Sequence, residues 1–181
     1  MWTTPGLVER VSLAWAKAIH NNGGHPDVSV GTMRFALQLW ISMFLIFAIA
    51  SGCSAILGTF EETFTSLIII GFLRYFSGGW HFRSLDICIF VTTALAIAIP
   101  LLPNIEYVWL ILLNGSSLLL VLLFAPTGHG QQFRSANQRR AFRWISLAIV
   151  AMNFLCLTES ATVSILSQSL TLISTKRRCT R

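Results

Sequence analysis

Charged side chains are scarce in this chain of 181 residues. They make up 11% of the sequence, whereas hydrophobic residues make up 54%. Soluble globular domains carry about 25% charged residues, so this deficit excludes an ordinary soluble domain. It indicates that lipid is the solvent for much of the chain, and the repeated apolar runs predict a single membrane-embedded domain over residues 1–181.

Cysteine pairs are also missing. Cys53, Cys88, Cys156 and Cys179 are widely spaced, and no CxxC motif occurs. This spacing argues against both a disulfide framework and a zinc finger. We therefore expect free thiols, no metal and no other cofactor. Cys53 and Cys156 lie in apolar runs and are interpreted as packing residues, and Cys179 as an incidental thiol.

A continuous apolar signal segment is absent from residues 1–32, so we expect no secretory signal there. Instead the pattern predicts an amphipathic helix that lies in the membrane interface. The apolar stripe of this helix consists of Leu7, Val11, Ala14, Trp15 and Ala18. The stretch "NNGGHPD" is expected to end it.

Six apolar runs follow, and they predict an all-α, polytopic membrane bundle of about six transmembrane helices over residues 33–175, before a basic tail at 176–181. The runs are 34–57, 60–76, 84–102, 105–125, 141–157 and 159–174. The last two are short, and "LTES" between them is typical of a tight turn in a hairpin. Five spans, with the last run at the interface, is the alternative.

The distribution of basic residues favours six spans. If the amino terminus is cytoplasmic, all thirteen Lys and Arg residues fall on the inner side, and Glu61, Glu62, Glu106 and Glu159 fall outside. Basic residues near span ends mark the cytoplasmic side. We expect both termini and the loop after the second run to be cytoplasmic. The net charge of +6 then needs no nucleic-acid partner.

Reactive side chains gather in "FSGGWHFRSLDIC", residues 76–88, between the second and third runs. Gly78 and Gly79 allow the backbone to turn and end the second run. Ser84 is a suitable N-cap for the next helix. Cys88 then lies near the start of that helix, where the helix dipole favours a thiolate.

His81 precedes Cys88 by seven positions. On one continuous helix the two residues would lie about 10 Å apart along the axis, too far for proton transfer. If His81 instead lies in the loop before the helix, the chain can fold it back over Cys88 as the base of a thiol nucleophile for acyl transfer. The residues alone leave this interpretation and simple packing about equally open.

The stretch "RYFSGGWHFRSLDIC" resembles the hallmark of the AgrB family, the accessory gene regulator protein B of bacterial quorum sensing. Members of that family carry an Arg, a Gly-Gly, a His two positions later and a Cys seven beyond the His. The matching residues are Arg74, Gly78, Gly79, His81 and Cys88.

A later stretch, "FAPTGHGQQFRSANQRR", is similar to the second conserved region of the family. The matching residues are Ala125, Pro126, Asn137, Arg139 and Arg140. Family sequences often have Asp or Glu after the Ala-Pro, with Pro and Lys downstream, where this chain has "TGHG" and "QQFRS". This departure bears on substrate recognition more than on the chemistry.

The resemblance implies a cysteine endopeptidase of the bacterial cytoplasmic membrane that cuts a small precursor peptide near its carboxyl end. Cys88 would be the nucleophile and His81 the base, and a peptide side chain would then close a thiolactone or lactone. The implied partners are an AgrD-like precursor, with an amphipathic amino terminus and an acidic carboxyl terminus, and a second copy of the chain. Arg74, Arg139 and Arg140 would bind precursor, or serve only as topology anchors.

No third catalytic residue is assigned. Ser77 or Ser84 could orient His81 through a hydroxyl group, although a helix cap is a sufficient explanation for Ser84. Asp86 faces away from Cys88 on a helix, and the dipole at the helix start is a sufficient explanation for its position.

Two other classes of protein fit the sequence pattern less well. A metal-dependent membrane protease would need a role for the pair Glu61-Glu62 or a site built from His20, His25 and His129, but the pattern shows no suitable carboxylate partner. A transporter or scaffold usually has ionisable residues deep in its spans. The interiors of the spans here carry only neutral polar residues, such as Asn114, Asn153 and Gln168, which are typical of helix–helix contacts.

Overall fold

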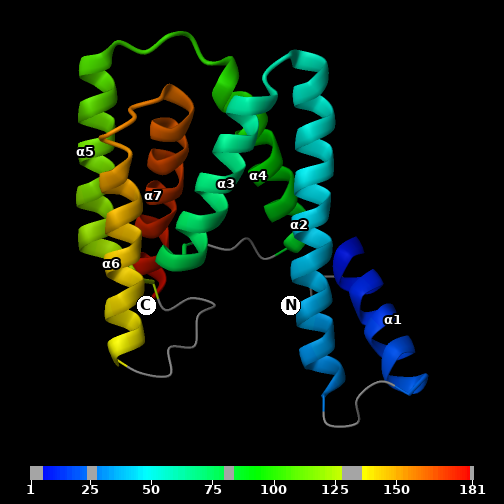
Figure 1. Ribbon diagram of the computed structural model, residues 1–181. Coiled ribbons are helices and arrows are strands. Elements are labelled where there is room, and N and C mark those ends of the chain that lie inside the picture. The colour runs from blue at the N-terminus through cyan, green and yellow to red at the C-terminus, as the bar shows by residue number, and fades with distance from the viewer. Residues whose placement is uncertain (1–5, 24–27, 80–83, 128–135, 180–181) are drawn as a thin grey trace. The chain divides into compact units, whose positions relative to one another are not determined.

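The computed structural model describes residues 6–23, 28–79, 84–127 and 136–179, and its regular elements in these ranges are all helical (Figure 1). The elements are α1 (Leu7–Asn21), α2 (Val30–Leu57), α3 (Phe60–Ser77), α4 (Leu85–Ala98), the 3-10 turn η1 (Ile99–Leu101), α5 (Tyr107–Phe124), α6 (Ala136–Met152) and α7 (Glu159–Cys179). The all-α class is confirmed.

The helices follow the apolar runs closely, because a run of apolar residues between turn residues is a local feature of the sequence. The largest differences from the predicted boundaries lie in the last two helices. Helix α6 begins at Ala136, inside the basic stretch, and ends at Met152. Helix α7 continues to Cys179, so the start of the basic tail is helical. The connection between α6 and α7 at 153–158 forms the predicted hairpin.

Two of the described helices, α2 and α5, are long and apolar enough to cross a membrane, and α4 with η1 forms a shorter apolar helix. These helices indicate a membrane protein. The apolar part of α6, residues 144–152, rises only about 14 Å, against about 30 Å for a hydrocarbon core. The number of spans and their sidedness therefore stay predictions.

Backbone contacts divide the chain into two compact units. The first contains residues 1–53 and 81–95, and the second contains residues 54–80 and 96–181. The first unit thus holds α1, most of α2 and most of α4. The second holds α3, η1, α5, α6 and α7.

Helix α1 of the first unit has two distinct faces. Its buried face consists of Val8, Ser12 and Ala16. The opposite stripe is exposed, with Leu7 70% and Trp15 57% accessible. The stripe predicted from the sequence therefore lies on the outer face of α1, which suits a helix in the membrane interface.

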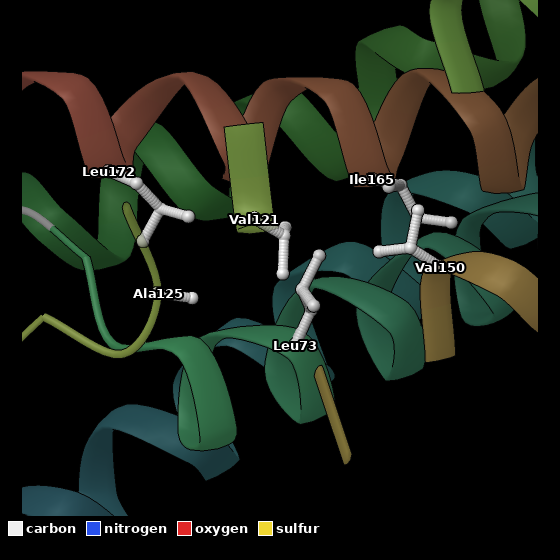
Figure 2. Close-up of a cluster of buried hydrophobic side chains, with 6 residues drawn as sticks. All are labelled: Leu73, Val121, Ala125, Val150, Ile165 and Leu172. Atoms are coloured by element: carbon white, nitrogen blue, oxygen red, sulfur yellow. The ribbon is translucent and has the colours of Figure 1, made fainter. Parts of the chain in front are cut away.

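Helix α7 lies at the centre of the second unit. It packs against both α3 and α5, and α6 packs against the same two helices. These four helices run side by side (Figure 1). Their apolar core, shown in Figure 2, consists of Leu73, Val121, Ala125, Val150, Ile165 and Leu172. The packing of α7 fits the predicted hairpin with α6, and the choice between five and six spans stays a prediction.

Buried amides join the helices of the second unit. The Asn153 side-chain amide donates hydrogen bonds to Asn114 Oδ1 (3.1 Å) and Thr162 Oγ1 (3.0 Å). Asn114 in turn donates to the Val150 carbonyl (3.3 Å). Such bonds across helices hold together a bundle that lipid surrounds, so these residues have the structural role that the sequence predicted for Asn114 and Asn153.

One end of the second unit brings together the loop before α5 and the start of α7. The Ile105 N–H donates a hydrogen bond to Glu159 Oε1 (3.1 Å). The contact shows that these two connections lie at the same end of the second unit, and the side of the membrane on which they lie stays a prediction.

Candidate active site

Helix α3 ends at the glycine pair, as predicted. Gly78 has φ 75° and ψ −148°, and its N–H donates a hydrogen bond to the Arg74 carbonyl (3.0 Å). Gly79 has φ 143°. Residues that have a Cβ atom are strained at such positive φ values, so glycine is required at both positions.

The glycine pair contacts the segment that follows α5. The Thr127 N–H donates to the Ser77 carbonyl (3.0 Å), and its hydroxyl lies 3.4 Å from the same oxygen. A Cβ on Gly78 would come within 2.5 Å of Thr127 Oγ1. Thr127 directly follows Ala125 and Pro126, which are joined by a cis peptide bond. The two motifs that the sequence presented separately therefore meet in the second unit.

Cys88 belongs to the first unit. Helix α4 begins at Leu85, directly after Ser84, and the Cys88 N–H donates to the Ser84 carbonyl (3.3 Å). Ser84 thus occupies the N-cap position, and Cys88 lies in the first turn, as predicted. The thiol forms no disulfide, and the residue is half-buried.

Asp86 has a role that sequence reasoning missed. Its carboxylate accepts hydrogen bonds from the Leu7 N–H (2.7 Å) and the Val8 N–H (3.2 Å). It therefore caps the start of α1 and ties that helix to the turn that holds Cys88. A Cβ on Gly6 would come within 2.6 Å of Asp86 Oδ2. The only signal in the sequence was the lack of a capping side chain at Gly6, which leaves the first amides of α1 in need of an acceptor.

We expect Asp86→Ala to lower the free energy of unfolding by about 1 kcal/mol, because a lost helix cap costs this much. Thermal unfolding of the purified protein in detergent measures the effect. Glu106→Ala is the matched control, since Glu106 precedes α5 and makes no side-chain cap hydrogen bond. An equal loss in the two variants would contradict the capping role of Asp86.

The basic residues of the candidate site differ in their surroundings. Arg74 is half-buried in the last turn of α3, whereas Arg139 and Arg140 are exposed near the start of α6. The Arg143 guanidinium donates to the Leu122 carbonyl at the end of α5. Arg143 therefore has a capping role, and Arg139 and Arg140 present their charges on the surface.

Some predicted site residues lie outside the described ranges, and the others are divided between the two units. His81 is not among the described residues, and neither are His25 and His129. Arg74 and the glycine pair belong to the second unit, whereas Ser84 and Cys88 belong to the first. Among the residues that the structure describes, no three His, Cys, Asp or Glu side chains form a group that could hold a metal ion.

Comparison with known proteins supports the resemblance seen in the sequence. A family model described as Accessory gene regulator B matches residues 13–174. Protein FsrB of Enterococcus faecalis (strain ATCC 47077 / OG1RF) is 25% identical over 128 residues, which are 68% of this chain and 53% of that protein. The chain thus spans about half the length of this relative. No solved structure matches the chain significantly. The family match includes both motifs, from Arg74 to Arg140.

Proposed function

Because the chain belongs to the accessory gene regulator B family, we propose that it matures a quorum-sensing peptide as a cysteine endopeptidase of the bacterial cytoplasmic membrane. The observation that carries this proposal is the position of Cys88. It lies in the first turn of α4 and is half-buried. The thiolate is the nucleophilic form of cysteine, and the proposal assigns its formation to His81 as the base.

The proposed chemistry is acyl transfer in two steps. In the first, His81 takes the thiol proton, the Cys88 sulfur attacks the scissile carbonyl, and the released amine receives the proton from His81. The amino-terminal part of the precursor is then held on Cys88 as a thioester. In the second step, a thiol or hydroxyl of the same peptide attacks the thioester, its proton returns to the Cys88 sulfur, and a cyclic thiolactone or lactone leaves.

Substrate binding is assigned to the basic residues. We propose that Arg139 and Arg140, which are exposed near the start of α6, attract the acidic carboxyl-terminal segment of an AgrD-like precursor. Arg74, in the last turn of α3, would also bind the precursor. The same proposal places this face on the cytoplasmic side, where the positive-inside rule puts basic segments. In this proposal the active form of the enzyme is a homodimer.

Co-expression with a candidate precursor, followed by mass spectrometry, tests the proposal. The candidate is a short peptide with an amphipathic start and an acidic end, encoded beside the gene. The expected product is a cyclic fragment lighter by one water than the linear fragment of the same sequence. A precursor with a scrambled carboxyl-terminal half is the control. Recovery of only intact precursor, from membranes that contain both proteins, would contradict the proposed function.

A further inference from the structure

The last helix directs a buried polar side chain at the glycine pair. Gln168 of α7 is 3% exposed, and its Nε2 donates a hydrogen bond to the Gly78 carbonyl (2.9 Å). Both residues belong to the second unit. The sequence suggested only a helix–helix contact for Gln168, yet its partner is the turn that ends α3.

The Gly78 carbonyl depends on this amide. The Ser77 hydroxyl lies 3.2 Å from the Gly78 oxygen but 2.6 Å from the Leu73 oxygen. A hydroxyl group has one hydrogen, and the closer acceptor takes it. The neighbouring Ser77 carbonyl is bonded to Thr127. Without Gln168, the buried Gly78 oxygen would keep only the longer contact to the Ser77 hydroxyl, which also donates to the Leu73 carbonyl.

Close approach of Gly79 to α7 makes this bond possible. A Cβ on Gly79 would lie 2.7 Å from Thr171 Oγ1 and 2.9 Å from Gln168 Nε2. Any larger residue would therefore push the turn away from α7. The glycine pair thus has two functions, because it reverses the chain and it also lets the backbone lie directly against the last helix.

We propose that Gln168 is a positioning residue of the peptidase. It holds the Gly78–Gly79 turn against α7 and so sets the point from which the chain continues to His81. One residue separates Gly79 from His81 in the sequence. We expect a shift of the turn to shift this base as well, because the chain connects them directly. This inference rests on the proposed function of His81 and Cys88.

The test compares Gln168→Met with Thr162→Val. Methionine has nearly the size of glutamine but cannot donate to Gly78. Thr162 is on the same helix and accepts the bond from Asn153, so its replacement also removes a buried hydrogen bond but leaves the turn intact. Folded fraction, precursor binding, single-turnover cleavage and the alkylation rate of Cys88 at neutral pH are measured for both.

We expect Gln168→Met to lower the cleavage rate by about tenfold or more, since a displacement of 1 Å can cost about a hundredfold. Precursor affinity should stay within about twofold, and alkylation of Cys88 should slow. Thr162→Val should lose thermal stability but keep both rates. Gln168→Asn, whose amide is one methylene too short to reach Gly78, should repeat the loss if the Met variant fails to fold.

Equal effects of the replacements at positions 168 and 162, or a normal cleavage rate in a folded Gln168→Asn variant, would overturn the inference. In these outcomes Cys88→Ala would still be inactive, and the proposed function would stand. Cleavage by Cys88→Ala would instead remove the proposed function, and the inference would fall with it.

Discussion

Precursor cleavage is expected to fall by about 10³-fold or more in Cys88→Ala, the scale seen when an enzyme loses its nucleophile. The protein should still insert and fold, because the side chain is half-buried and alanine fits the first turn of α4. Cys88→Ser should be nearly as inactive, since a hydroxyl group in this position is far less ionised than a thiol. Cleavage is measured on the purified protein in lipid vesicles.

The other cysteines supply the controls for this experiment. Cys53 is half-buried in α2, whereas Cys156 is exposed in the connection between α6 and α7 and is therefore not the packing residue that its apolar run predicted. Cys53→Ala and Cys156→Ala should keep most of the activity, because a small change in packing costs stability before chemistry. Retained cleavage in Cys88→Ala would remove the nucleophile assignment.

His81→Gln should also abolish cleavage, by a factor of about 10²–10⁴, the usual contribution of a general base. Glutamine can form a hydrogen bond but cannot accept the thiol proton. The precursor should still bind, so the loss should appear in the single-turnover rate and not in the dissociation constant. A folded His81→Gln variant that processes precursor at the normal rate would show that the Cys–His mechanism is wrong.

Alkylation of Cys88 separates activation of the thiol from binding of the peptide. In the wild-type protein the reaction at neutral pH should be faster than that of an ordinary cysteine, and its pH profile should report the coupled pair. His81→Ala should slow the reaction near pH 7 and let it recover at higher pH, where the thiol ionises without a base. Identical profiles for wild type and His81→Ala would contradict a base role for His81.

Local patterns in the sequence were sufficient to predict the helices and much of the motif chemistry. Apolar runs between turn residues determined where α2, α3 and α5 begin and end, because a helix depends mainly on its own residues and their immediate neighbours. The glycine pair predicted the end of α3, and Ser84 predicted the start of α4. The position of Cys88 in a first helical turn followed from these two breaks alone.

Only the tertiary structure decided which distant residues meet. Thr127 lies 50 positions from Ser77, Asp86 lies 79 positions from Leu7, and Gln168 lies 90 positions from Gly78. Each contact joins a backbone group to a side chain whose type is common in helices and loops, so no periodicity or spacing marks it. The partners of the polar side chains of α7 were hidden for a related reason. The sequence predicted a helical run over residues 159–174 and a helix–helix contact for Gln168. It did not predict the hydrogen bonds that join the buried serine, threonine and glutamine side chains of α7 to the turn after α3, to the α6–α7 connection and to α7 itself.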